Sequence, residues 1–256
     1  MSILDETTVL ILTYNEEANI RRTLSNLQWA RRIVVVDSFS TDETINILHM
    51  DSRVEVHQRR FDSHANQWNY GLDRIQSEWV LALDADYQIT EYFVEELRSL
   101  SPPQTVDGYY ARFKYMVNGR VLRATLYPPR AVLFKCSRCR YEQNGHTQVL
   151  QIPGPTGWLN SPIHHDDRKP LSDWLRAQDK YTLLEAHYLT RYPADKLNFA
   201  DRLRNWIIPA PVIVFLYTLF IRGLILDGWR GWYYVSQRTL AEILLSLRLL
   251  EIRLEQ

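Results

Sequence analysis

Residues 79–86 read WVLALDAD, five apolar residues followed at once by two aspartates that are separated by an alanine. A short apolar run bounded by polar residues is typical of a strand that is buried on both faces. In an open parallel sheet, ligands bind beyond the carboxyl ends of the strands. We therefore expect residues 79–83 to form a core strand, and Asp84 and Asp86 to lie at the edge of the sheet where a ligand binds.

Runs of the same kind precede this one, and amphipathic stretches separate them. Strand and helix alternating at this spacing predict a doubly wound, mostly parallel α/β sheet. The expected strands are residues 8–12, 33–36 and 54–56. The expected helices are residues 15–29, a helix capped by Ser40 or Thr41, residues 63–75, and a helix that is capped by Thr90 and ends near Leu100.

The pattern changes after residue 100. Asn118-Gly119 lies between β-rich runs and predicts a hairpin with a two-residue turn, a β-hairpin extension of the sheet. Residues 170–189 have the period of a long amphipathic helix. Cys136 and Cys139 have half the spacing of a zinc site, but no second half accompanies them, so we expect two reduced thiols at the end of a strand.

The last quarter of the chain contains an apolar stretch, residues 206–226. A helix from Pro211 to Asp227 would be about 24 Å long. This length falls short of the roughly 30 Å hydrocarbon layer of a membrane. Tryptophans and arginines flank the stretch, as in segments that lie in the headgroup zone. We therefore expect a helical region that associates with a membrane surface; the alternative is a buried core or oligomer helix.

The composition excludes some partners. Formal net charge is +0, so the chain has no basic surplus for nucleic acid. The amino terminus has neither a basic start nor an apolar run, so it is not a signal peptide, and we expect a cytoplasmic location. Neither Gly-x-Gly-x-x-Gly nor a P-loop follows any expected strand, which argues against a dinucleotide oxidoreductase and a P-loop ATPase.

The acidic pair at the end of the fourth expected strand indicates a site for a divalent cation. Asp84 and Asp86 can share one hard cation, because Mg²⁺ and Mn²⁺ favour carboxylate oxygens and complete their coordination with phosphate oxygens and water. Such a cation neutralises the charge of a departing diphosphate. The simpler interpretation is a solvated loop with two acids, since Asp-x-Asp alone is common by chance.

Five segments together resemble family 2 glycosyltransferases with the GT-A fold. Residues 13–17, 35–44 and 83–86 match three signatures of that family in order and spacing, and residues 60–72 are similar to a further segment of it. Residues 226–231 and the preceding apolar stretch resemble the subgroup that adds sugars during lipopolysaccharide-core assembly. The resemblance implies a GT-A (Rossmann-like) fold and an inverting transfer from a nucleotide sugar, with Mg²⁺ or Mn²⁺ as cofactor.

The resemblance also assigns roles by position. In this chain Tyr87 follows the acidic pair where the subgroup usually has a further acidic residue nearby. The implied base-pocket residues are Thr13, Asn15 and Glu16; Asp37 accepts from base or ribose; Arg60, or equally Arg59, contacts base or diphosphate; Asp84 holds ribose or a metal-bound water; and Asp86 binds the metal.

A general base must take the proton of the acceptor hydroxyl, and a carboxylate opposite the leaving group suits this task. Family members often have a His-Glu pair after the hairpin region, whereas this chain has His146-Thr147. The candidates for the base are Glu142 and Asp166, ranked equally, with Asp167 below them. Either His146 or His165 could complete the metal shell or contact the diphosphate.

The expected organisation is a catalytic domain over residues 1–190 and a helical, membrane-interfacial region over 191–256. Within the catalytic domain, residues 1–100 bind the nucleotide and 101–190 the acceptor. We expect transfer of a hexose from a uridine-linked donor to a saccharide or lipid-linked acceptor in cell-envelope polysaccharide or lipopolysaccharide synthesis. The enzyme would lie peripherally on the cytoplasmic face of the membrane, with oligomer contacts possible through its last helices.

Two alternatives compete with this interpretation. A nucleotidyltransferase also uses paired acids on a parallel sheet, but it needs a glycine-rich basic loop after the first strand, where this chain has Tyr14-Asn15-Glu16-Glu17. A catalytically inactive, sugar-nucleotide-binding membrane scaffold would explain Tyr87 and Thr147. Donor hydrolysis in the presence of Mn²⁺ separates the scaffold from the enzyme.

Overall fold

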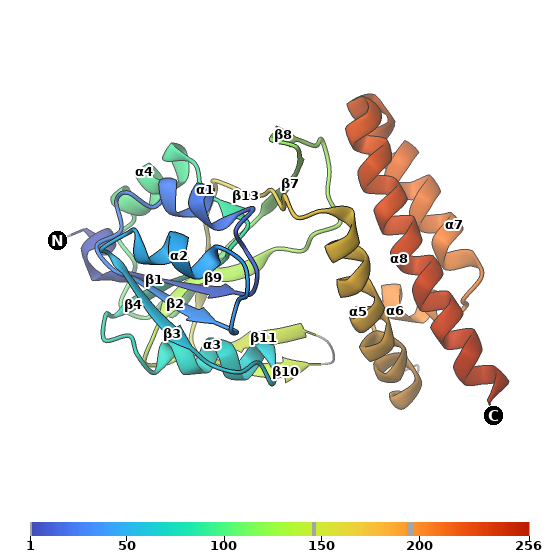
Figure 1. Ribbon diagram of the computed structural model, residues 1–256, viewed down its shortest axis with the longest axis horizontal. Helices are drawn as coiled ribbons and strands as arrows, with labels where there is room; N and C mark the ends of the chain where they lie inside the picture. The colour runs from blue at the N-terminus through green and yellow to red at the C-terminus, as the bar shows by residue number, and fades with distance from the viewer. Residues whose placement is uncertain (1, 145–146, 194–196, 256) are drawn as a thin grey trace. The chain divides into compact units, whose positions relative to one another are not determined.

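The computed structural model describes residues 2–144, 147–193 and 197–255 (Figure 1). The chain forms two compact units. The sheet unit consists of Met1–Val121 and Leu126–Arg168, and the helical unit consists of Leu122–Thr125 and Lys169–Gln256.

A seven-stranded sheet forms the centre of the sheet unit. Its strand order is β12-β6-β9-β4-β1-β2-β3, and β4, β1, β2 and β3 run parallel to one another. The predicted mostly parallel α/β fold is thus confirmed, with the antiparallel strand β9 inserted between β4 and β6. The strands are β1 (Thr7–Thr13), β2 (Ile33–Asp37), β3 (Val54–Gln58), β4 (Trp79–Asp84), β6 (Gly108–Ala111), β9 (Arg130–Lys135) and β12 (Thr156–Trp158).

Alternate residues of the central strands enter two separate cores. Val9 and Ile11 of β1 join a cluster with side chains of α1 (Ile20–Ser25), α2 (Thr44–His49) and α4 (Glu91–Ser99). Leu10 between them points the other way, to α3 (His64–Leu72), whose Gly71 lies so close that an added Cβ would come 2.5 Å from a Leu10 methyl carbon. Helices therefore cover both faces of the sheet, as Figure 1 shows, which explains the unbroken apolar strands.

Two expected helix starts are wrong, because the residues before α1 and α2 form loops at the edge of the sheet. The helix predicted over residues 15–29 is limited to α1, because residues 14–19 form a loop at the edge of the sheet, where Asn15 has a φ of +52°. Ser40 does not cap α2, which begins at Thr44, because its hydroxyl donates to Asp37 instead. Thr90, in contrast, caps α4 as predicted by accepting from the Phe93 N–H.

Smaller sheets complete the sheet unit. Four strands lie in the order β5-β13-β7-β8: β5 (Tyr87–Gln88), β13 (Ile163–His165), β7 (Phe113–Val117) and β8 (Arg120–Val121). The β7–β8 turn confirms the predicted hairpin, since both Asn118 and Gly119 have positive φ values. A second hairpin, β10 (Arg140–Asn144) and β11 (Thr147–Gln151), packs against α3.

The two cysteines are free and buried, as predicted. Cys136 directly follows β9, and Cys139 lies in the next turn. Burial raises the pKa of the Cys139 thiol to about 11. Both thiols are therefore structural core groups with little thiolate at neutral pH.

The helical unit consists of helices packed along its last one. α8 contacts both α5 and α7. The single helix predicted from Pro211 to Asp227 is wrong, because the chain breaks at Gly223, where φ is +72°. The helices are α5 (Leu171–Arg191), α6 (Phe199–Arg204), α7 (Pro209–Leu216), a π-helix (Tyr217–Ile221), a 3₁₀ helix (Leu224–Asp227) and α8 (Gly228–Leu254).

Among the described residues, no individual helix combines the length and apolar character of a membrane span. Pro209–Ile221 and Leu224–Leu254 meet the criterion only as a pair, with a bend of 69° between them.

Candidate active site at the carboxyl edge of the sheet

Asp37, the last residue of β2, organises the first wall of the site. It is fully buried, and its Oδ1 accepts from the hydroxyls of Thr13 at 2.9 Å and Ser40 at 2.5 Å. Its Oδ2 accepts from the Ser40 N–H at 2.8 Å and from Gln58 at 3.3 Å. The carboxylate that was predicted to receive the base or ribose therefore also fixes the ends of three neighbouring strands.

The loop after β1 is tied to the loop after β2. Asn15 Oδ1 accepts from the Thr41 N–H at 2.8 Å, and the Asn15 N–H donates to Ser40 Oγ at 2.8 Å. The Glu16 N–H donates to Thr44 Oγ1 at 2.7 Å. These bonds hold the predicted pocket residues Thr13, Asn15 and Glu16 beside Asp37, and they leave Tyr14 exposed next to them.

The acidic pair stands at the carboxyl end of β4, next to β1 in the sheet. Strand β13 pairs with β5, so that His165 lies opposite Tyr87. This pairing brings His165 Nε2 to 2.9 Å from Asp86 Oδ2. The structure thus brings together two of the three predicted metal ligands, with Asp84 two residues away on the same strand end.

Aromatic rings enclose His165. Tyr115 and Tyr127 each place a ring centroid 4.8 Å from the imidazole, and Tyr87 lies at 5.5 Å. Burial alone would lower the pKa of His165, but the neighbouring carboxylates, chiefly Asp86, raise it overall. The Tyr87 hydroxyl lies 2.5 Å from the Tyr127 hydroxyl, so the residue that replaces an expected acid is part of this aromatic wall.

Asp166 is the centre of an ion-pair cluster. Its side chain is 3% exposed and pairs with Arg22 at 2.7 Å and with Arg168 at 2.9 Å. The Gly119 N–H donates to its Oδ1 at 3.3 Å, and its own N–H donates to the Asp86 carbonyl at 3.1 Å. This candidate base thus connects four segments of the chain.

The other candidates lie in different settings. Glu142 on β10 is exposed and accepts from Gln151 Nε2 at 3.0 Å. Asp167 accepts from Asn19 at 2.9 Å. Arg59 is held by Asp62 and Gln67, whereas Arg60 is exposed. His146 lies outside the described residues.

Four residues of the site were not identified from the sequence, namely Arg22, Arg130, Arg168 and Tyr127. Arg168 binds Asp166 from two residues further along the chain, whereas Arg22 binds it from a segment 144 residues away, and no local pattern indicates that second pairing. Arg130 begins β9 directly after Pro128-Pro129 and lies with its guanidinium 5.0 Å from the centre of the Tyr127 ring. A basic residue at the start of an apolar strand was the available signal for Arg130.

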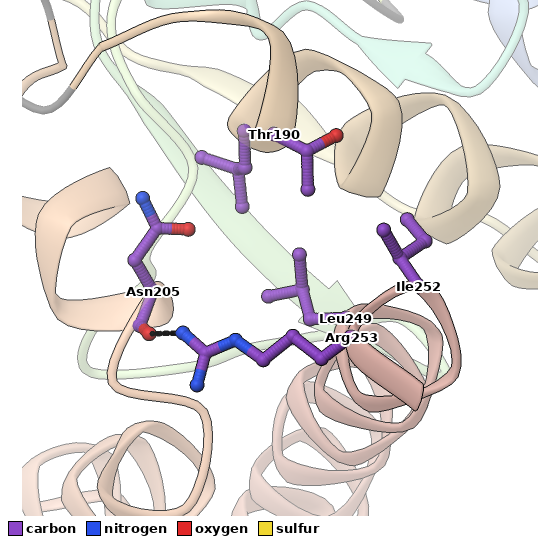
Figure 2. A pocket seen from close by; sticks show the side chains of 6 residues that line it. Thr190, Asn205, Leu249, Ile252 and Arg253 are labelled. Carbon is purple, nitrogen blue, oxygen red and sulfur yellow. Dashed lines mark hydrogen bonds between the residues drawn. The ribbon is translucent and has the colours of Figure 1, made fainter. Parts of the chain in front are cut away.

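A pocket of about 290 Å³ lies elsewhere, within the helical unit. Figure 2 shows the side chains around it, with Arg253 donating to the Asn205 carbonyl at 3.0 Å. Leu189, Thr190, Leu249 and Ile252 complete its lining. None of the predicted site residues contributes to this lining, so we assign the chemistry to the edge of the sheet and not to this pocket.

Comparison with known proteins agrees with the motifs at that edge. Residues 8–123, which contain β1, β2 and the acidic pair, match the family described as Glycosyl transferase family 2. The chain carries a family 2 glycosyltransferase domain. The loops around Asp37 and Asp84–Asp86 therefore lie in the segment that matches this family.

Two relatives of this chain are named as glycosyltransferases. The chain is 28% identical over 132 residues to an uncharacterized glycosyltransferase of Rickettsia bellii, an alignment that covers 50% of this chain but only 43% of the Rickettsia protein. It is 23% identical over 231 residues to the lipopolysaccharide core biosynthesis glycosyltransferase LpsC of Rhizobium meliloti, covering 86% of this chain and 83% of LpsC.

Among solved structures, S. aureus TarS in complex with UDP-GlcNAc is similar to this family 2 protein with a TM-score of 0.46 and 16% identity. The alignment covers 94% of this chain and 90% of the TarS chain.

Proposed function

We propose that this family 2 glycosyltransferase moves a hexose from a nucleoside diphosphate donor, UDP-linked, to a saccharide or lipid-linked acceptor. The transfer inverts the anomeric centre and serves the synthesis of cell-envelope polysaccharide or lipopolysaccharide. One observation carries the proposal: Asp84 and Asp86 end β4 at the carboxyl edge of the sheet, and His165 approaches Asp86 to 2.9 Å. LpsC, the lipopolysaccharide relative, supports the choice of pathway.

The donor set at Asp86 fits a divalent cation. A carboxylate oxygen and an imidazole nitrogen lie together, and Asp84 ends the same strand. The described part of the chain contains no group of three acidic, histidine or cysteine side chains able to hold a metal. Mg²⁺ and Mn²⁺ commonly use one or two carboxylates and fill their other positions with substrate phosphates and water. When bound, the cation would neutralise charge on the departing diphosphate.

The residues of the first two strand ends bind the nucleotide in this proposal. Thr13, Asn15 and Glu16 line the base pocket, and Asp37 holds it in shape while accepting from base or ribose. Arg60 is the exposed arginine beside the pocket, and it contacts the base or diphosphate. The nucleotide half is residues 1–100, and the acceptor half is residues 101–190.

We assign the general base to Glu142. Both oxygens of the rival Asp166 already accept hydrogen bonds from guanidinium groups, so neither is open to an acceptor hydroxyl. Glu142 is exposed and accepts one neutral hydrogen bond, so it can receive the proton of an acceptor hydroxyl. Asp166 then acts as a positioning residue that fixes the backbone next to Asp86.

The helical unit attaches the enzyme to the cytoplasmic face of the membrane in this proposal. Trp206, Ile208, Phe220, Ile221 and Trp229 are all more than half exposed, and Arg222 and Arg230 lie among them in the sequence. Exposed tryptophans with neighbouring arginines suit the interface between headgroups and acyl chains. Contact between two copies through these helices is the competing explanation of the same face.

The decisive experiment replaces Asp86. Asp86→Asn should lower transfer from UDP-sugars in the presence of Mn²⁺ by about a hundredfold or more, the rate equivalent of several kcal/mol of electrostatic stabilisation. Asp73→Asn is the matched control, because Asp73 is an exposed aspartate whose nearest cation is Arg140 at 3.5 Å. Undiminished turnover in Asp86→Asn contradicts the proposal. A wild-type chain that binds UDP-sugar without turnover is a scaffold, and release of pyrophosphate from UTP in the presence of a sugar 1-phosphate identifies a nucleotidyltransferase.

A further inference from the structure

Arg130 lies at the same edge of the sheet as the acidic pair. Strand β9 runs antiparallel to β4, with Lys135 at its end opposite Trp79 at the start of β4. The first residue of β9, Arg130, is therefore on the side where β4 ends in Asp84. A cation thus stands beside the predicted diphosphate site, although no family motif indicated it.

The guanidinium of Arg130 is half-buried between tyrosines. Its carbon lies 5.0 Å from the centre of the Tyr127 ring, and the Tyr127 hydroxyl is in contact with that of Tyr87. Burial by itself lowers the pKa of Arg130, but nearby phenols and the charge of Asp84 raise it overall, so the group is a permanent cation.

The guanidinium of Arg130 has no acceptor among the described residues. No carboxylate there lies within 4.0 Å of it, and no oxygen accepts a hydrogen bond from it. Arg22 and Arg204 are also partly buried and pair with Asp166 at 2.7 Å and with Glu242 at 3.0 Å, whereas Arg238 of the helical unit has no such pair either. Of these two arginines, only Arg130 stands at the edge of the acidic pair, where its unused N–H donors can bind an anionic ligand.

We propose that Arg130 binds a phosphoryl oxygen of the substrate held at Asp84 and Asp86. The inference rests on the proposed function and adds a residue to it. Two carboxylates and a diphosphate together carry more negative charge than one divalent cation neutralises, and a planar guanidinium supplies the missing positive charge in a fork that matches phosphate oxygens. The phosphate belongs either to the departing diphosphate of the donor or to a phosphorylated acceptor.

Calorimetry with two ligands tests the donor source. Arg130→Gln should weaken the binding of UDP in the presence of Mn²⁺ by about 10- to 100-fold, the loss typical of a charge-assisted hydrogen bond, and leave the binding of uridine unchanged. Arg130→Lys should recover part of the loss. Arg112→Gln is the matched control, because the Arg112 guanidinium also lies over an aromatic ring, that of Trp158 at 5.1 Å, and should leave both affinities unchanged.

Steady-state kinetics tests the acceptor source. If UDP binding is unchanged in Arg130→Gln but the KM of a phosphorylated acceptor rises about tenfold or more, the phosphate is that of the acceptor. Equal loss of UDP and uridine binding together with a lower Tm would show a structural role and overturn the inference, as would two variants that behave like wild type. If the wild-type chain itself fails to bind UDP, the proposed function fails instead, and the two failures are thereby distinguished.

Discussion

The sheet unit and the helical unit use apolar residues in opposite ways. In the sheet unit, the central strands bury theirs on both faces, and the polar side chains gather at one edge. In the helical unit, Trp206, Ile208 and Trp229 expose between 68% and 89% of their surface. The sheet unit therefore buries its apolar side chains within itself and has its polar site at one edge. The helical unit instead exposes apolar side chains, which is typical of a surface that contacts a membrane or another protein.

The largest expected effect tests Glu142 as the general base of the sheet unit. Glu142→Gln should lower kcat by about 10²- to 10⁴-fold, the usual contribution of a general base, without lowering the Tm, because Glu142 is exposed. The measurement is transfer kinetics with thermal unfolding alongside. A variant with wild-type kcat would remove Glu142 from the mechanism and return Asp166 or Asp167 to consideration.

The next effect compares how much stability is lost when an ion pair is removed from each unit. Asp166→Ala should lower the free energy of unfolding by about 3 kcal/mol, because it leaves two guanidiniums around an uncompensated buried position. Asp179→Ala removes an exposed partner of Arg248 in the helical unit and should cost under about 1 kcal/mol. Chemical denaturation of both variants gives the comparison, and equal losses would show that Asp166 is not a structural centre.

A smaller effect concerns the exposed apolar face. Trp229→Ser should weaken binding to vesicles that contain anionic lipid by about tenfold, from the loss of one buried aromatic side chain. Tyr92→Ser is the control, since Tyr92 is 83% exposed but belongs to the sheet unit. Flotation assays measure both. Absence of vesicle binding in the wild type, together with a dimer by light scattering that Trp229→Ser dissociates, would assign the face to a second copy.

The last prediction concerns the buried thiol of Cys139. A pKa of about 11 for Cys139 lies above the ordinary value of a cysteine, 9.0, so the folded state holds this proton more tightly than the unfolded state. The stabilisation is present below pH 9 and is lost as the pH rises towards 11. At pH 8 a thiol reagent should modify folded Cys139 roughly a hundredfold more slowly than the unfolded chain. Equal rates would contradict its burial.

The sequence predicted what depends on neighbours in the chain. The four parallel strands and the acidic pair followed from apolar runs that end in polar residues, and Asn118-Gly119 indicated its own turn. The start of α1 could not be predicted in this way. Hydrogen bonds between the preceding loop and residues 40–44 keep that loop from becoming helical, and these partners lie far from it in the sequence. The pairing of Asp166 with Arg22 was missed because the two residues lie 144 positions apart in the sequence.

The helical unit shows the limit of composition as evidence. An apolar run with flanking tryptophans indicated a surface-seeking segment, but its continuous helix was wrong. Gly223 interrupts the run and has a positive φ. A glycine adopts this conformation without strain, so its presence was a signal in the sequence that the estimate of helix length did not use.

The cluster around Asp166 also sets an order of events during synthesis. Its carboxylate joins Arg22, near the amino terminus, to Arg168, the last residue of the sheet unit. A ribosome-bound chain that has not yet emerged as far as Arg168 can pair its early strands, but it cannot form the ion pairs that tie Arg22 to the end of β13. Nascent chains should therefore acquire protease resistance in the early strands first and around Arg22 only after Arg168 leaves the exit tunnel.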